Sequence, residues 1–383
     1  MSTSANLDEA VAEVGDEIDA RLDGRSPDLV FMFATHHFGG DLARAGAEVV
    51  EATGTGALAG CTGAWTVGTA REEESSPGLS VLAAHLPGTS IQVHRLAPPA
   101  EGGEMSSPLP IDSSDRTSVL ALADPFTFPV PRWLDAIAEV HPGLPLAGGL
   151  SSGGIAPGQN VLFAGSDPVN SGAIAVVLEG ATRMLNVVSQ GCRPVGEPLV
   201  ATRVDGNVVL ELRGKPAAKV LFETLEELDA EDRALFQSGA FFGRAVDAAK
   251  SSFDSGDLLV RNIMGLDPER HAIAVADDGI RAGATLQLMV RDRDSASAEL
   301  RDVLEIAGLA TAGEAIGGLL FTCGGRGQGM FGSPHHDAAA IEDAFGPGFP
   351  VAGFSANGEI GSVGGRPFLH GFTASAALLA PRD

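Results

Sequence analysis

The sequence lacks tyrosine, contains only three lysines, and carries a formal net charge of −25 over 383 residues. Its basic side chains are therefore nearly all arginine. A chain this acidic is repelled by the phosphates of DNA and RNA and by the headgroups of anionic lipids. We expect neither a nucleic acid nor a membrane among its partners.

Long apolar runs are also missing. The runs present span about 5 to 8 residues, whereas a helix that crosses a membrane needs roughly 18. The first 22 residues are acidic and lack an apolar core, so they resemble neither a secretory signal nor a transit peptide. We expect a cytoplasmic protein.

Clustered metal ligands are absent too. The three cysteines, Cys61, Cys192 and Cys323, are widely spaced and form neither a disulfide framework nor a CxxC metal site. Adjacent helical positions such as His336 and Asp337 point about 100° apart, so such neighbours rarely share one ion. The sequence predicts no metal and no cofactor.

Glycine and proline, by contrast, are frequent, with 50 and 23 residues, and they mark a repeated phrase. Residues 348–359 read as a buried strand that runs into a glycine-rich turn carrying Ser355, Asn357 and Glu359. The same phrase occurs at residues 143–154, and a looser copy occurs at residues 58–63. The repetition indicates that turns of similar units build the site.

The three copies end units of similar length. From the start of a strand to the Ala-Gly pair, the spacing is 30 residues for Leu29 to Ala59, 28 for Val119 to Ala147 and 33 for Leu319 to Ala352. Each unit reads as strand, helix, strand and turn, and a further apolar strand follows. We predict an α/β (α+β) fold in which mixed sheets are covered by helices, in two domains of repeated strand-helix-strand units.

Local signals add detail. A hairpin is predicted for residues 79–84 and 91–96, and another around Asp205-Gly206-Asn207. Residues 98–115 read as an exposed loop, and Ser333-Pro334 reads as a helix start. The break at residues 213–216 separates an N-terminal helix (1–26) and a first domain (27–214) from a second domain (215–383).

Motifs at both ends of the chain occur together in one known family. The C-terminal part combines Cys-Gly-Gly-Arg at residues 323–326 with Gly-Phe-Ser-Ala-Asn-Gly-Glu at residues 353–359, followed by Leu-His-Gly-Phe-Thr at 369–373. The N-terminal part has the strand at Leu29, Ala-Gly-Cys-Thr at 59–62 and the phrase at 145–149. Through these motifs, most closely the C-terminal ones, roughly residues 28 to 380 resemble the FIST family of prokaryotic sensory modules, which have an N-terminal and a C-terminal domain.

The resemblance implies ligand sensing in signal transduction, with small molecules such as amino acids as the ligand class. It supplies no established catalytic residues. Family members are often fused to transmitter or methyl-accepting modules, whereas this sequence holds the module and a short helix. The resemblance therefore implies a separate signalling protein as a partner.

The charged pair Arg326 and Glu359 is the first candidate for a ligand site. Both follow strands of the last unit, and Arg326 can bind a carboxylate through two hydrogen bonds while Glu359 takes an ammonium group. The alternative is that the two side chains pair with each other and brace two turns. The candidate ligand-binding residues together are Ser355, Asn357, Glu359, Cys323, Arg326, His370, Cys61 and Thr62.

Two other classes of function stay open. Cys323, with His370 or Glu359 as a base, or Cys61, would serve a cofactor-independent hydrolase, although a buried cysteine at a strand end is also a common structural residue. A scaffold that binds only a partner protein is the third class. We assign no catalytic residue.

Overall fold

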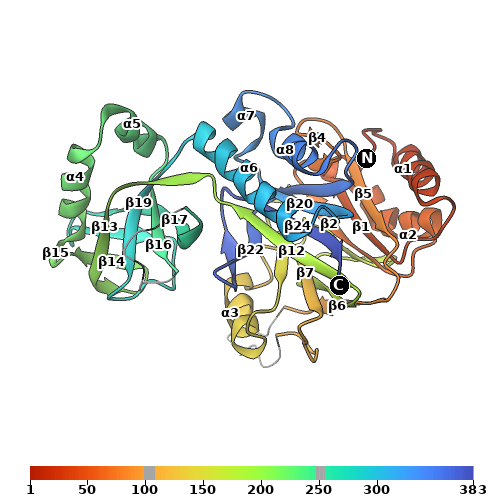
Figure 1. Ribbon diagram of the computed structural model, residues 1–383, viewed down its shortest axis with the longest axis horizontal. Coiled ribbons are helices and arrows are strands. Elements are labelled where there is room, and N and C mark those ends of the chain that lie inside the picture. Colours follow the sequence, from red (N-terminus) through yellow and green to blue (C-terminus); the bar gives the residue numbers. More distant parts are fainter. Residues whose placement is uncertain (99–107, 247–249, 251–252, 254, 383) are drawn as a thin grey trace. The chain divides into compact units, whose positions relative to one another are not determined.

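The computed structural model describes residues 1–98, 108–246, 250, 253 and 255–382. The chain forms two compact units, Met1–Val188 with Leu300–Asp383, and Ser189–Glu299 (Figure 1). The smaller unit is thus inserted into the larger one along the chain. The domain boundary expected at residues 214 and 215 falls inside the smaller unit, so the expected domains 27–214 and 215–383 do not coincide with the compact units.

The larger unit contains the three predicted repeats. In each repeat, two strands joined by a helical segment pair in parallel, and a later strand pairs with the first in antiparallel fashion. The first repeat comprises β1 (Leu29–Thr35), α2 (Leu42–Thr53), β2 (Leu58–Gly63) and β5 (Leu79–Ala84). The second comprises β7 (Thr117–Ala123), α3 (Val130–Val140), β8 (Leu146–Leu150) and β11 (Ala173–Gly180). The third comprises β20 (Gly317–Cys323), α7 (Gly327–Phe331), α8 (His336–Phe345), β21 (Val351–Ala356) and β24 (Ala374–Pro381).

Short hairpins tie the three sheets together. After the second strand of each repeat, the chain forms a hairpin that joins the sheet of another repeat. The hairpins are β3 (Thr66–Gly68) with β4 (Arg71–Glu73), β9 (Leu162–Ala164) with β10 (Asp167–Val169), and β22 (Glu359–Val363) with β23 (Arg366–His370). The resulting orders are β10-β9-β2-β1-β5, β23-β22-β8-β7-β11-β6 and β12-β24-β20-β21-β3-β4.

Two further strands also cross between sheets. β6 (Thr89–Leu96) follows β5 but pairs with β11, and β12 (Thr182–Ser189) follows β11 but lies beside β24. The hairpin predicted for residues 79–84 and 91–96 is therefore wrong. The turn at Pro87-Gly88 carries the chain from one sheet to another, because β5 already pairs with β1.

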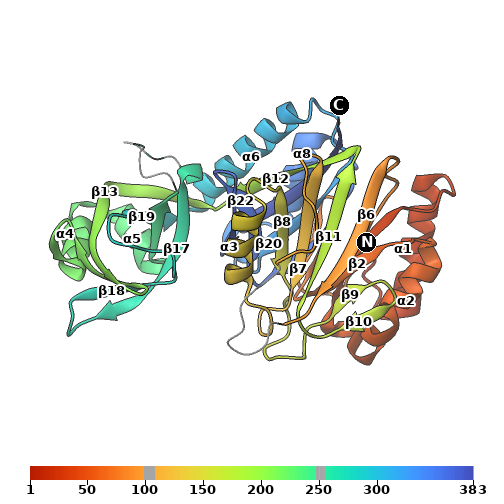
Figure 2. The same cartoon turned by 90° about the horizontal axis from the view of Figure 1, so that it is seen from below.

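A central core lies between the three sheets. Alternate residues of β1 divide between its two faces: Phe31 and Phe33 enter the central core, while Val30 and Met32 pack under helices. The other repeats divide in the same way, as period-two alternation in a strand requires. The helices α1 (Leu7–Leu22) and α2 cover the outer face of the β1 sheet, whereas α3 and the pair α6 (Arg293–Ala310) and α8 cover the other two (Figure 2).

In each Ala-Gly pair, the second position must be glycine for a steric reason. The three glycines pair with the middle of the parallel neighbouring strand, where a side chain would collide with a backbone carbonyl. An added Cβ would lie 1.9 Å from the oxygen of Met32 at Gly60, 1.8 Å from that of Ala121 at Gly148 and 1.9 Å from that of Leu320 at Gly353. The repeated phrase therefore records close packing of two parallel strands.

The smaller unit is a seven-stranded sheet that closes on itself, because β13 pairs with β19 through its first half and with β14 through its second. The predicted turn at Asp205-Gly206-Asn207 joins β13 and β14 as expected. Its elements are β13 (Cys192–Asp205), β14 (Val208–Leu212), β15 (Lys215–Pro216), α4 (Ala217–Glu227), α5 (Ala230–Ser238), β16 (Phe241–Ala245), β17 (Leu258–Asp267), β18 (Ala272–Val275) and β19 (Thr285–Arg291). The 3₁₀ segments are η1 (His36–Asp41) in the larger unit and η2 (Ser255–Asp257) here.

Two local predictions need correction. Helix α8 begins at His336 rather than at Ser333, because its cap comes from elsewhere in the chain, as described below. The predicted exposed loop 98–115 lies outside the described residues for 99–107. In its later part Leu109 is buried, and the Pro108 carbonyl accepts a hydrogen bond of 2.6 Å from the Trp133 indole.

Candidate functional site

A pocket of about 640 Å³ opens at the carboxyl ends of the parallel strands of the larger unit. Its walls are Ala64 after β2, residues 152–155 after β8, residues 323–325 at the end of β20, and residues 355–359 from the end of β21 to the start of β22. Residues 369–372, at the end of β23, and Phe126 complete it. All three repeats thus contribute their equivalent turns to one cavity, and ligands commonly bind at such strand ends.

Ser152 joins the three turns. Its backbone N–H donates to the Thr62 carbonyl at 3.1 Å, and its hydroxyl oxygen accepts from the N–H of Ala64 at 2.8 Å. The same hydroxyl donates to the Ser355 carbonyl. One buried side chain therefore links the first and third repeats through the second, which holds the pocket walls in place.

Glu359 is the acidic residue in the lining of this pocket. It is 0 % exposed, one carboxyl oxygen accepts the backbone N–H of Thr373 at 3.1 Å, and the other oxygen has no hydrogen-bond partner among the described residues. Burial raises the pKa of Glu359 well above its ordinary value, and the Thr373 hydrogen bond and the positive charge of Arg326 offset only part of the rise. A buried, incompletely bonded carboxyl that lines a cavity is a candidate ligand group.

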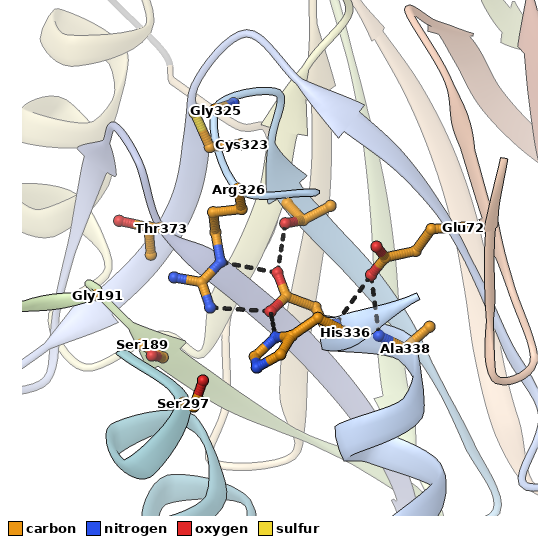
Figure 3. Close-up of polar contacts among 12 residues, drawn as sticks. Glu72, Ser189, Gly191, Ser297, Cys323, Gly325, Arg326, His336, Ala338 and Thr373 are labelled. Carbon is orange, nitrogen blue, oxygen red and sulfur yellow. Dashed lines mark hydrogen bonds and ion pairs between the residues drawn. The ribbon is translucent and has the colours of Figure 1, made fainter. Parts of the chain in front are cut away.

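Arg326 is held by a carboxylate of its own repeat. Its Nε and one terminal nitrogen donate to the two oxygens of Asp337 at 2.7 and 2.9 Å, and both side chains are buried (Figure 3). Burial alone would raise the pKa of Asp337, but the Arg326 guanidinium holds it well below its usual range. Thr322 and His336 also bond this carboxylate, and Arg326 does not line the pocket.

Behind this pair, Glu72 of β4 caps helix α8. Its carboxylate accepts the N–H groups of Asp337 at 3.1 Å and Ala338 at 3.0 Å (Figure 3). Burial and the nearby charge of Asp337 raise the pKa of Glu72 to about 8. The sequence predicted this helix start at Ser333, with Ser333 as the cap. In the structure, Glu72 from another repeat provides the cap instead, because its carboxyl group accepts the first free N–H groups of the helix.

Cys323 and His370 lie on the same pocket. The Cys323 thiol is partly exposed and accepts an N–H from Gly325 at 3.4 Å, whereas His370 is 3 % exposed with Nε2 3.1 Å from the Gly361 carbonyl. Ser355 and Asn357 line it as well, Ser355 buried and Asn357 exposed. Five of the eight predicted residues therefore meet at this cavity.

Cys61, Thr62 and Arg326 lie outside the lining. Cys61 is fully buried in the central core, and burial raises the pKa of its thiol well above the ordinary value. The Thr62 hydroxyl accepts the Val161 N–H at 3.1 Å and so fastens the β9 hairpin. The structure places these two side chains among packing and bracing residues.

Sequence reasoning missed the turn at residues 152–155. The second copy of the phrase includes residues 152–154 of this turn, but it lacks an acid, so the sequence pointed to the charged third copy. Glu72 had no sequence signal at all, because its partners Asp337 and Ala338 are far along the chain. Among the described residues, no group of three metal-ligating side chains is arranged to hold an ion, and no described helix has the length and apolarity to cross a membrane.

Comparisons with known proteins match most of this chain to one family and to relatives of similar length. The family model of the FIST N domain matches residues 28–215, and that of the FIST C domain matches residues 217–362. The uncharacterized protein Mb0898c of Mycobacterium bovis is 37% identical over 379 residues, which cover 99% of this chain and 97% of that protein. The uncharacterized protein Rv0628c of Mycobacterium tuberculosis is 36% identical, with 99% and 98% covered.

Proposed function

Because the chain belongs to the FIST family, whose domains are sensory modules of signal transduction, we propose that it binds a small molecule in the pocket at the strand ends. The observation that carries the proposal is Glu359, a residue of the pocket lining whose buried carboxyl has one oxygen without a partner among the described residues. A ligand that donates a hydrogen bond to this oxygen removes the cost of leaving it unsatisfied.

The proposed ligand carries an amine, and amino acids are the first class to examine. Burial disfavours the charged form of Glu359 and raises the pKa of its carboxyl well above the ordinary value. An incoming ammonium group favours the carboxylate instead, so Glu359 releases its proton as the ligand binds. Because Arg326 is already paired with Asp337, the carboxylate end of an amino acid would meet the glycine turn at Gly324, where a backbone N–H group can approach an anion.

A thermal-shift screen of metabolites, beginning with amino acids, tests this proposal. A ligand of the pocket raises the melting temperature of the wild-type protein. Titration calorimetry in two buffers of different ionisation enthalpy then measures the proton that Glu359 releases. Glu359→Gln, which keeps the size and cannot ionise, should weaken an amine ligand at least tenfold, whereas Arg366→Gln on an exposed surface pair serves as the control. Equal affinity of both variants would contradict the proposal.

A cysteine-dependent hydrolase is the second candidate, because Cys323 and His370 line the same pocket. Turnover of a thioester or activated ester that is lost in Cys323→Ala would support it. A ligand that is bound and recovered unchanged supports the sensor. A cytoplasmic location and a separate signalling partner belong to the same proposal.

A further inference from the structure

The three sheets of the larger unit are built alike, but one of them is a strand short. β11 has β6 on its outer side, and β24 has β12, whereas β5 ends its sheet. Among the described residues, only Ser2 pairs with the outer edge of β5, through a single antiparallel bridge to Leu79. Two of the three sheets thus have a strand at this outer place, whereas no described strand pairs along β5 there.

A groove of about 610 Å³ runs along this edge. Val81 and Ala83 of β5 form its floor, α1 forms one wall through Ile18, and Ile316 and Leu379 of the third repeat form the other. The geometry matches the pattern of the other sheets. After β5 of the first sheet the chain enters the second sheet as β6, and after β11 of the second sheet it enters the third as β12. The open place beside β5 correspondingly lies next to the third sheet.

The backbone of β5 is arranged to accept a strand there. Leu79 donates its N–H to Ser2 at 3.0 Å and accepts from Ser2 at 2.9 Å, so Leu79 directs both groups away from β1. Because the direction alternates along an antiparallel strand, Val81 and Ala83 direct theirs outward as well. Unpaired groups of this kind on a sheet edge form a template for an added strand.

The side chains around the groove specify the added strand. In the equivalent places, Ile91 and Val93 of β6 and Met184 of β12 pack against the central core; here Leu82 and Leu379 of that core line the groove instead. Three arginines of the lining, Arg21, Arg25 and Arg71, stand against one carboxylate, Glu17, in a chain of net charge −25. Glu17 pairs with Arg21 and Glu73 pairs with Arg71, which leaves Arg25 without an acidic partner among the described residues. This local excess of positive charge favours an acidic occupant.

We propose that the β5 edge binds an extended segment of a partner protein as an added antiparallel strand, with apolar residues at alternate positions and acidic residues between them. A second copy of this chain fits less well, because its own β5 lies between the same walls. None of the groove residues lines the ligand pocket, so the proposal stands apart from the proposed function. It assigns a surface through which a sensor of this kind can pass on its signal.

Selection of phage-displayed decapeptides on the intact protein tests the proposal. The selected peptides should alternate apolar residues with Asp or Glu, and fluorescence anisotropy with synthetic copies measures their affinity. Ala83→Pro removes an outward N–H without touching the ladder to β1 and should weaken binding at least tenfold. Arg25→Glu should weaken it similarly, whereas Arg366→Glu, outside the groove, should not.

Peptides methylated at alternate backbone nitrogens keep the test independent of whether Ala83→Pro folds. Methylation in the register that faces β5 should abolish binding, and methylation in the other register should leave it unchanged. Selection that enriches no peptide, or peptides that bind wild type and Ala83→Pro equally, would overturn the proposal. So would a wild-type dimer that Ala83→Pro converts to a monomer in light scattering, because a second copy would then occupy the edge.

Discussion

The carboxyl group of Glu359 and the backbone N–H of Thr373 are joined by one hydrogen bond of 3.1 Å. Thr373 directly precedes β24 of the third repeat, and Glu359 begins β22 of the hairpin that joins the second sheet, so this bond ties the hairpin to the start of β24 at the pocket wall. It satisfies one oxygen and leaves the other buried without a partner among the described residues. The pair therefore combines a bracing role with a candidate binding role in one side chain.

Replacement of Glu359 by glutamine should make stability less dependent on pH. The pKa of Glu359 is raised in the folded state, so the folded protein retains a proton that the unfolded chain releases above about pH 4.3. Its contribution to stability is complete below that pH and falls as the pH rises toward the folded pKa. In urea unfolding at pH 5, 6.5 and 8, the stability of Glu359→Gln relative to the wild type should increase with pH. A difference in stability that stays constant over these pH values would contradict this prediction.

The buried pair of Arg326 and Asp337 should be sensitive to the loss of either partner. Their side chains are 0% and 2% exposed, so Arg326→Ala leaves a buried carboxylate without its partner. We expect a loss of about 3–5 kcal/mol in the free energy of unfolding. The double variant Arg326→Met, Asp337→Leu should lose less than either single variant, because no lone charge stays buried.

The pair of Arg366 and Asp135 provides the control for this cycle. Both side chains are about half exposed or more, and exposed ion pairs contribute about 0–1 kcal/mol. Arg366→Ala should therefore change the unfolding midpoint in urea only slightly. Similar losses for Arg326→Ala and Arg366→Ala would show that burial does not govern the strength of these pairs.

Glu72 should also make stability depend on pH, over a defined range. The pKa of its carboxyl is about 8 in the folded protein and about 4.3 in an unfolded chain. Stability from this group is therefore complete below about pH 4.3 and lost as the pH rises through 8, with an upper limit of about 5 kcal/mol. Glu72→Gln keeps an acceptor for the two N–H groups of α8 and should lose less stability between pH 5 and 8 in urea titrations. Parallel pH curves for the two proteins would exclude the expected titration.

Substitution of the repeated glycine should test the packing of the parallel strands. In Gly353→Ala, the new methyl group meets the Leu320 carbonyl at 1.9 Å, and strain of this kind costs about 1–3 kcal/mol or more. Gly40→Ala is the matched control, because an added Cβ there meets nothing within 4 Å. Differential scanning calorimetry should show a large fall in melting temperature for the first variant and a small change for the second.

The three thiols should differ in their reactivity. Cys323 is partly exposed at the pocket, whereas Cys61 and Cys192 are 0% and 3% exposed. Iodoacetamide should therefore label Cys323 first, and the other two only after unfolding. Mass spectrometry of tryptic peptides locates the label, with Cys323→Ser as the control. Equal early labelling of Cys61 would show that the central core opens readily.

Much of the larger unit could be predicted from the chain itself. The apolar runs at residues 29–34, 119–123 and 319–321 indicated strands, and the repeated Ala-Gly phrase indicated that three units are alike. These signals are local: a strand buried on both faces must be apolar throughout, and a strand packed against a backbone carbonyl must have glycine there. Five of the predicted ligand residues line one pocket for the same reason, since equivalent turns follow equivalent strands.

Partnership between distant residues could not be read from the sequence. The sequence suggested Glu359 as a partner for Arg326, whereas in the structure Arg326 pairs with Asp337. Glu72, which comes from another repeat, accepts the N–H of Ala338 at the start of α8. The strands β5 and β6 looked like a hairpin, yet their hydrogen bonds go to different sheets. Local pattern thus determined which segments are strands, turns and helices, whereas the tertiary structure decided which carboxylates are buried and paired, because burial and distance depend on the packing of all three repeats together.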